Sequence, residues 1–374
     1  MTLTKVTKLS TIVFLLVAFH SFAQTTNIPD SNFEQALIDL NYDTGIVDGT
    51  VPTINIANVT TLNIANKEIL DLTGIEDFAA LETLICHSNK LTNLDLSQNI
   101  NLISLFCHQN RLVNLNVSQN VLLTTLQCYR NQLTSLDVSQ NTALVILFCA
   151  NNKLANLDVS NNIALRNLYC YYNQLTTLDV SQNTALIRLD CFRNELTELD
   201  VSQNLNLEHL YCYNNQLTGL DLTENTALRM FNCSNNELTI LNLNNGNNGN
   251  IDRFFARNNA DLTCITVDDP SYSISNWTNV DAHATFSLDC NPLSTDEFEV
   301  NGLSIYPNPF QNELNITILD DAYYRLFNAK GQIVSSGTLE IGDTKVNLSR
   351  LTGGLYYLII KTETGEVSKK VIKY

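Results

Sequence analysis

Ten cysteines are the residues of this chain with the most evident chemistry, and eight of them recur at every twenty-first position. The eight are Cys86, Cys107, Cys128, Cys149, Cys170, Cys191, Cys212 and Cys233. Cysteines can bind metals or pair as disulfides. On neighbouring parallel strands, however, the Cβ atoms lie about 4.8 Å apart and the side chains run side by side, whereas a disulfide needs about 3.8 Å. We therefore predict free, buried thiols that act as small hydrophobic residues.

Two histidines, His87 and His108, occupy the same position in adjacent copies, so their Cα atoms are expected about 5 Å apart. A shared metal ion is one interpretation, but no third ligand is evident in the sequence, and solvated histidines at the rim are the other. The chain also contains no nucleophile elbow, P-loop, zinc-protease helix or dinucleotide fingerprint. We predict a protein that is not an enzyme and that uses neither a cofactor nor a metal.

The element that positions these side chains is a repeated unit, L-x-x-L-x-C-x-x-N-x-L-T-x-L-D-V-S-x-N-x-x, which residues 165–186 show almost whole. Self-similarity at this period predicts a solenoid, because one coil cannot bury its own leucines whereas stacked coils share a core. The leucines and the cysteine are expected to point inward, and the L-x-C segment is expected to form a short strand. Nine such strands in parallel would make a sheet about 40 Å long on the concave side.

The unit resembles the leucine-rich repeat, in the short form common in secreted bacterial proteins, over about residues 54–267. We place the solenoid itself at residues 62–267. The predicted fold class is therefore a leucine-rich-repeat solenoid of short coils with few or no helices, followed by a small C-terminal β-sandwich. The resemblance implies a recognition or adhesion scaffold that binds a protein partner.

Two polar columns also follow the period. An asparagine lies three residues after each cysteine, as in Asn110 and Asn152, and we expect its amide to be satisfied by backbone groups of the turn and of the next coil. An aspartate column, which includes Asp95 and Asp137, is expected on the back of the coils. We interpret it as turn hydrogen bonding, with a calcium-binding stripe as the alternative.

The N-terminus has the pattern of an export signal. Residues 1–23 combine two lysines, a short apolar run and small residues at the end, which predicts cleavage between Ala23 and Gln24. No other stretch reaches the length needed to span a membrane. Residues 24–61 are expected to form a helical cap, in which Asp30 or Ser31 begins a helix and Glu34 lies at capping-box spacing from Ser31.

Cys264 and Cys290 fall outside the period and enclose the only tryptophan, Trp277. An exported chain matures in an oxidising compartment, which permits a disulfide between them. We predict this disulfide within a C-terminal cap and linker at residues 268–298.

Residues 299–374 lack the period and contain about seven short alternating runs punctuated by glycines, which predicts a small β-sandwich. They resemble the C-terminal sorting domain of the type IX secretion system. The resemblance rests on Tyr306-Pro307-Asn308-Pro309, on Gly354-Leu355-Tyr356 and on the basic tail around Lys369-Lys370. It implies contact with the secretion machinery and export through the periplasm to the outer cell surface or the medium. A generic β-sandwich binding module is the alternative.

The candidate binding residues lie in the two outward positions that flank each of the eight periodic cysteines and Ala256, which replaces the cysteine in a ninth copy. Nine of these eighteen positions hold Phe or Tyr, although aromatic residues make up only 8% of the chain. A contiguous apolar patch on a solvated sheet favours a contact surface. The predicted concave-face residues, with polar neighbours included, are Tyr129, Arg130, Phe148, Tyr169, Tyr171, Arg188, Phe192, Arg193, His209, Tyr211 and Tyr213.

Three interpretations of this face remain open. A protein partner is the first, a glycan that stacks on the Tyr and Phe rings is the second, and an inert surface component whose rings only stabilise the sheet is the third. The net charge of −17 argues against nucleic acid and anionic lipid as main partners, because both would be repelled.

Overall fold

The computed structural model describes residues 24–290, 303–362 and 366–374. They form two compact units, one ending at Cys290 and the other following it. The predicted signal at 1–23, with cleavage after Ala23, lies outside the described residues. Gln24 is the first of them, and its carbonyl accepts a hydrogen bond from the Thr53 N–H at 2.9 Å. Among the described residues, no helix is long and apolar enough to cross a membrane.

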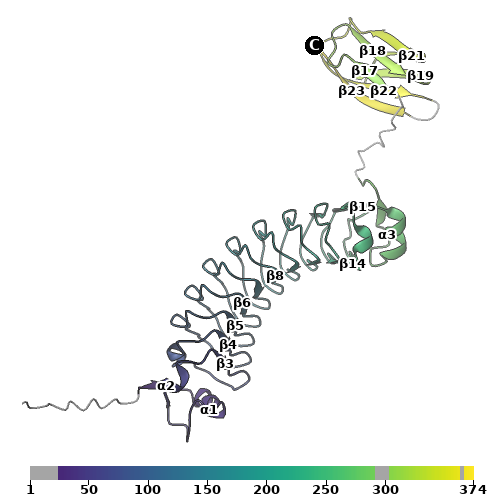
Figure 1. The fold of residues 1–374 in the computed structure, drawn as a ribbon. Coiled ribbons are helices and arrows are strands. Elements are labelled where there is room, and N and C mark those ends of the chain that lie inside the picture. Colours follow the sequence, from purple (N-terminus) through teal and green to yellow (C-terminus); the bar gives the residue numbers. More distant parts are fainter. Residues whose placement is uncertain (1–23, 291–302, 363–365) are drawn as a thin grey trace, which may run out of the picture. The chain divides into compact units, whose positions relative to one another are not determined.

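The first unit is a parallel solenoid, in which one short strand from each coil joins a ten-stranded sheet. Figure 1 shows the coils following a curved path, with the labelled strands β3, β4, β5, β6 and β8 along its inner edge. The strands of this sheet, in spatial order, are β3 (Thr61–Asn63), β4 (Thr83–Ile85), β5 (Ser104–Phe106), β6 (Thr125–Gln127), β7 (Ile146–Phe148), β8 (Asn167–Tyr169), β9 (Arg188–Asp190), β10 (His209–Tyr211), β12 (Met230–Asn232) and β14 (Arg253–Phe255).

The core of the solenoid is continuous, because every coil contributes leucines and a thiol to the same interior. One hydrophobic cluster runs from Ile28 to Trp277. All eight periodic cysteines are free and completely buried, as predicted. Burial also keeps the thiols protonated, since it raises the pKa of Cys86 and of Cys149 to about 12. These thiols therefore serve as packing groups and not as nucleophiles.

The strands lie one residue earlier than the sequence pattern predicted. In the second cysteine coil, β5 is centred on the buried Leu105 and ends just before Cys107, whose N–H still bonds the Gln127 carbonyl of the next coil at 2.9 Å. Backbone bonding between coils continues to the second residue beyond the cysteine, since the Gln109 N–H bonds the Tyr129 carbonyl at 2.9 Å. The extended conformation ends there, because Gln109 has a positive φ of 56°. The sheet has ten strands instead of nine, since the degenerate copy around Leu62 contributes β3.

Strands on the back of the coils form only near the C-terminal end of the solenoid. They are β11 (Gly219–Asp221), β13 (Ile240–Leu243), β15 (Cys264–Val267) and β16 (Thr285–Ser287), which pair in parallel. In the earlier coils, the aspartates on the back accept hydrogen bonds from backbone N–H groups of their own turns, as predicted. Asp137 Oδ1, for example, accepts the Ser139 N–H at 2.9 Å.

The N-terminal cap closes the first coil with an apolar helix face. It contains β1 (Thr25–Asn27), α1 (Ser31–Asp39), β2 (Thr50–Pro52) and α2 (Thr53–Ile56), and a 3-10 turn follows at Ile75–Asp77. Asp30 caps α1, whereas the alternative capping box between Ser31 and Glu34 does not form. Glu34 is fully buried instead, and its carboxylate accepts the N–H groups of Asp48 and Gly49.

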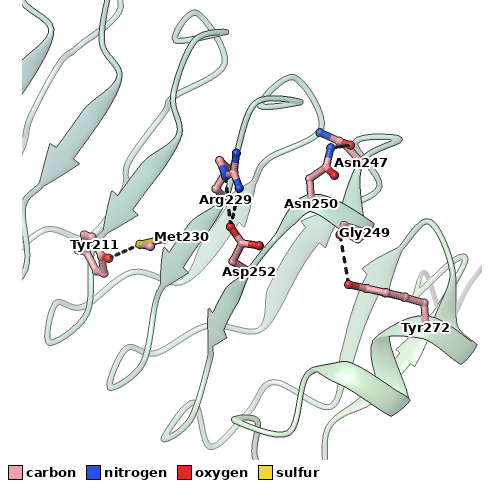
Figure 2. Close-up of polar contacts among 8 residues, drawn as sticks. All are labelled: Tyr211, Arg229, Met230, Asn247, Gly249, Asn250, Asp252 and Tyr272. Atoms are coloured by element: carbon pink, nitrogen blue, oxygen red, sulfur yellow. Dashed lines mark hydrogen bonds and ion pairs between the residues drawn. The ribbon is translucent and has the colours of Figure 1, made fainter.

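The C-terminal cap covers the last coil with α3 (Pro270–Asn276) and with Trp277, which is 3% exposed and stacks on Phe254 with ring centroids 4.3 Å apart. The predicted disulfide joins Cys264 to Cys290, with Cα atoms 5.6 Å apart. Figure 2 shows a further tie, the hydrogen bond from the Tyr272 hydroxyl to the Gly249 carbonyl in the short turn Asn248–Asn250.

The second unit is an antiparallel β-sandwich with its own core, which includes Phe310, Ile316 and Leu358. One sheet contains β17 (Ser304–Tyr306), β18 (Glu313–Ile318) and β21 (Gly342–Asn347). The other contains β20 (Ile333–Leu339), β19 (Ala322–Asn328), β22 (Gly354–Lys361) and β23 (Glu366–Lys373). The predicted sandwich is therefore confirmed.

Candidate functional site

Seven aromatic side chains form a continuous stack on the solvent-facing side of the ten-stranded sheet. Six of them occupy the position after the cysteine in successive coils, and each ring contacts the next. We call the set the ring stack: His87, His108, Tyr129, Phe148, Tyr171, Phe192 and Tyr213.

In one coil the position after the cysteine holds no ring, and there the stack continues through the residue before the cysteine. Ala150 occupies the ring position in its coil and is completely buried. Phe148, two residues earlier, lies 4.2 Å from Tyr129 and 5.8 Å from Tyr171, measured between ring centroids. The stack therefore continues through the alanine coil, because Phe148 bridges the two flanking tyrosines.

Most ring faces in the stack are covered by neighbouring rings. The planes of Tyr171 and Tyr213 lie 8° and 9° from that of Phe192, with centroids 4.3 Å apart in both pairs. These three side chains are partly buried, so the solvent reaches their edges and not the shared faces. Burial also raises the pKa of Tyr171 and of Tyr213, which leaves both phenols protonated as hydrogen-bond donors.

Beside the ring stack, Arg188 lies between two further predicted rings. Its guanidinium carbon is 5.3 Å from the Tyr169 centroid and 5.2 Å from the Tyr211 centroid. Two of its N–H groups donate to Asp190, each at 3.0 Å. Burial raises the pKa of Asp190, which is 4% exposed, while the hydrogen bond from Arg188 opposes the rise. Much of the hydrogen-bonding capacity predicted for Arg188 is thus used within the protein.

The remaining predicted residues border these two groups. The side chains of Arg130 and Arg193 project from left-handed turn residues with φ of 53° and 55°. Arg193 lies 4.7 Å from the ring centroid of Tyr172, which packs edge-on against Tyr171 and Phe192. His209 is the β10 residue that pairs with Arg188 of β9, and burial lowers its pKa. Figure 2 shows the Tyr211 hydroxyl donating to Met230 Sδ at 3.2 Å.

The two histidines at the start of the stack are not arranged as a metal site. The rings of His87 and His108 stack with centroids 4.3 Å apart and planes 13° from parallel, so their in-plane nitrogen lone pairs do not converge on one point. Burial lowers the pKa of His108 to about 4, and His87 and Arg130 act in the same direction. Among the described residues, no group of three or more side chains suited to hold a metal is present.

An asparagine ladder holds the turns that carry the ring stack. Asn131 donates to the carbonyls of Cys107 and Cys128 at 3.1 and 3.0 Å, and its Oδ1 accepts the Leu112 N–H at 3.0 Å. The amide therefore satisfies its own turn, as predicted, but its second set of partners belongs to the preceding coil and not to the next one. This ladder fixes the backbone at the residue after each cysteine.

Sequence reasoning missed three features of this unit. Asp190 and Tyr172 lie within the face, and an i, i+2 spacing from Arg188 could have indicated Asp190. A second ladder of buried asparagines, whose signal was the S-x-N of each repeat, lines the back turns: Asn99, Asn120, Asn141, Asn162, Asn183, Asn204 and Asn225. Asn162 donates to Val138 and Asn141 carbonyls at 3.0 and 2.9 Å.

In the β-sandwich, the structure brings together motif residues that are far apart in the sequence. Pro307, Asn308 and Pro309 lie beside the C-terminal strand, because Asn308 Nδ2 donates to the Lys370 carbonyl at 2.9 Å and its Oδ1 accepts the Ile372 N–H at 2.9 Å. On the next strand, which begins at Gly354, the Tyr356 hydroxyl donates to the Thr352 carbonyl at 2.7 Å. Lys369, the remaining motif residue, pairs in register with Leu358.

The comparisons with known proteins decide the nature of this unit. Residues 304–374 match the family described as the secretion system C-terminal sorting domain. This unit is a type IX sorting domain. The sorting domain marks the chain for secretion or for display on the outer cell surface by the type IX system.

The first unit is a leucine-rich-repeat solenoid, and internalins are among the solved structures that it resembles. It resembles the functional domain of InlJ from Listeria monocytogenes, a structure that includes a cysteine ladder, with 26% identity, a TM-score of 0.52 and coverage of 94% of this chain and 99% of that one. An internalin (inlF) from the same species has 18% identity and a TM-score of 0.54, and covers 71% of this chain and 93% of its own. No curated protein matches the chain.

Proposed function

We propose that this protein is a non-catalytic recognition scaffold, secreted or held at the cell surface, that binds a protein partner in adhesion or in contact with a host or neighbouring cell. The observation that carries the proposal is the ring stack, seven contiguous aromatic side chains on the outer face of the ten-stranded sheet. Tyrosine and phenylalanine supply large contact areas with little side-chain entropy to lose, which is why they dominate recognition surfaces. The likeness to the InlJ functional domain supports this function.

A protein partner is favoured over a glycan by the way the rings are arranged. Sugar rings bind aromatic side chains by lying flat on an open ring face. Both faces of Phe192 are covered, one by Tyr171 and one by Tyr213. Ring edges and phenol hydroxyls remain for contact, and these suit the mixed apolar and hydrogen-bonding surface of a polypeptide.

The test uses the full chain from Gln24 as bait for surface proteins of host and neighbouring cells. A captured protein is then titrated against the wild type, against a Tyr171→Ala and Phe192→Ala double variant, and against Tyr323→Ala, which removes an exposed ring from the sorting domain. We expect the double variant to lose at least about tenfold in affinity and Tyr323→Ala to bind normally. Equal binding by all three chains would refute the proposal. Binding to a glycan array that disappears with Tyr169→Ala or Tyr211→Ala would favour the carbohydrate alternative.

The export route has a separate test. Deleting residues 299–374 removes the sorting domain, and we expect the truncated chain to accumulate in the periplasm. Normal surface display of the truncated chain would show that another segment directs export.

A further inference from the structure

Four exposed cations border the ring stack, and we call them the basic edge: Arg111, Arg130, Lys153 and Arg193. They lie two or four residues after a cysteine, in the turn that follows each short strand of the sheet. Within the described residues none of the four forms an ion pair, whereas the neighbouring Lys90 pairs with Glu68 at 3.2 Å. At the first, second and fourth positions after the six cysteines from Cys86 to Cys191, the sequence contains one acidic residue, Glu195, two residues after Arg193.

The opposite side of the same coils carries the negative charge. The back column contains exposed aspartates, among them Asp137, Asp158 and Asp179. Hydrogen bonds from the serine two residues further on lower the pKa of all three, so they are ionised at neutral pH. A chain with a net charge of −17 therefore presents a positive edge beside its aromatic surface. Such segregation attracts an anionic partner to one side and repels it from the other.

The exposed parts of the rings favour the same kind of partner. An aromatic ring is negative on its faces and positive at its edge, and the ring stack covers the faces. Tyr129, Tyr171 and Tyr213 recur at every second coil, about 10 Å apart. Their hydroxyls make no hydrogen bond within the described part of the chain, so they are available as donors to carboxylates. Asp190, an acidic residue on the same face, is already paired with Arg188.

We propose that the partner segment bound on the ring stack is an acidic stretch of polypeptide, whose carboxylates lie between the basic edge and the tyrosine hydroxyls. This inference rests on the proposed function and specifies its partner class. Arg130 and Arg193 are three coils apart, about 14 Å, which matches carboxylates four residues apart in an extended chain. Nucleic acid fits poorly, because its dense phosphates would meet only four cations on a strongly acidic protein.

The experiment selects displayed random ten-residue peptides on the full chain from Gln24. We expect enrichment of peptides with Asp or Glu, and binding that weakens as salt is raised. The informative variant is Arg130→Gln with Arg193→Gln, which should lower affinity for the selected peptides at least about tenfold. Glutamine is compatible with this turn, because Gln109 occupies the equivalent position with a φ of 56°.

Arg166→Gln is the matched control, since Arg166 is exposed in the same repeats but lies before its strand and away from the rings. It should leave peptide binding unchanged, and Arg193→Glu should shift the selection toward basic peptides. Failure to enrich any peptide, a neutral or basic pool, or an acidic pool that binds the double variant normally would overturn the proposal. Selection of neutral peptides whose binding is lost with Tyr171→Ala would refute the acidic nature of the partner and leave the proposed function standing. Peptides that bind Tyr171→Ala as tightly as the wild type would count against the proposed function as well.

Discussion

The rings of Tyr171 and Phe192 lie face to face in adjacent coils, with centroids 4.3 Å apart and planes 8° from parallel. This contact joins two coils on the solvent side of the sheet. It adds a side-chain contact to the backbone hydrogen bonds that already join the coils. The ring stack is therefore both a stabilising ladder and a candidate contact surface. The two roles are separable by experiment, because stability and binding respond to different variants.

A double-mutant cycle on this pair measures the stabilising role. Tyr171→Ala and Phe192→Ala should show a coupling of about 0.5–1.5 kcal/mol in the free energy of unfolding, measured in urea. Tyr129 and Phe192 do not contact each other and form the control pair, for which the two effects should add. Coupling no larger than in the control pair would mean that the stack contributes nothing beyond burial.

Much of the solenoid could be predicted from the sequence, because a strict period repeats one packing solution. The spacing of Cys107 and its equivalents fixed which side chains face the core. The position of the strand was less certain, since a short strand can shift by a residue when the following turn begins with a positive φ, as after Cys107.

The candidate site was harder to predict for physical reasons. The bridge from Tyr129 through Phe148 to Tyr171 depends on the rotamers of three rings around Ala150, which a residue pattern does not specify. The pairing of Arg188 with Asp190 likewise depends on side-chain direction. The repeat pattern indicates which positions point outward, whereas it does not specify which side chains contact one another there.

The first asparagine ladder gives the second prediction. Asn152 donates to the Cys128 and Cys149 carbonyls and accepts the Leu133 N–H. Asn152→Leu leaves these backbone groups without a partner and should lower the free energy of unfolding by about 1–3 kcal/mol. Gln132→Leu changes an exposed residue of the preceding coil and serves as the control. An Asn152→Leu chain that melts like the control would contradict the ladder's role.

The second ladder can be tested by a change that adds charge. Asn162 is fully buried, and Asn162→Asp replaces an amide donor by a carboxylate that faces two backbone carbonyls. We expect a loss of about 3 kcal/mol or more near neutral pH. The folded state should raise the pKa of the new carboxyl, so its stability deficit should shrink as the pH falls toward about 4. Asn161→Asp, at the exposed neighbour, should change stability by less than about 0.5 kcal/mol. A deficit that does not vary with pH would contradict this account.

His108 gives the solenoid a predictable pH dependence. Burial lowers its pKa from 6.5 to about 4 in the folded chain. Between these values the unfolded chain binds a proton that the folded chain does not, so stability should fall as the pH is lowered through this range. His108→Gln removes this contribution, and the wild type should therefore lose more stability than the variant between pH 7.5 and 4.5, measured by urea unfolding. Parallel pH profiles for the two chains would show that His108 is protonated equally in both states.

The disulfide between Cys264 and Cys290 closes the C-terminal cap, and its removal should act locally. Replacing both cysteines by serine should destabilise the cap by about 3–4 kcal/mol, because the unfolded loop gains conformational freedom.

Trp277, the only tryptophan, is 3% exposed and stacks on Phe254, so its fluorescence reports on the cap. We expect its transition to move to lower urea concentration than the far-ultraviolet circular dichroism transition of the coils. Reductant should reproduce the shift in the wild type and leave the serine variant unchanged, because the periodic thiols are already free. Coincident transitions in wild type and variant would mean that Trp277 packing, and not the covalent link, holds the cap on the last coil.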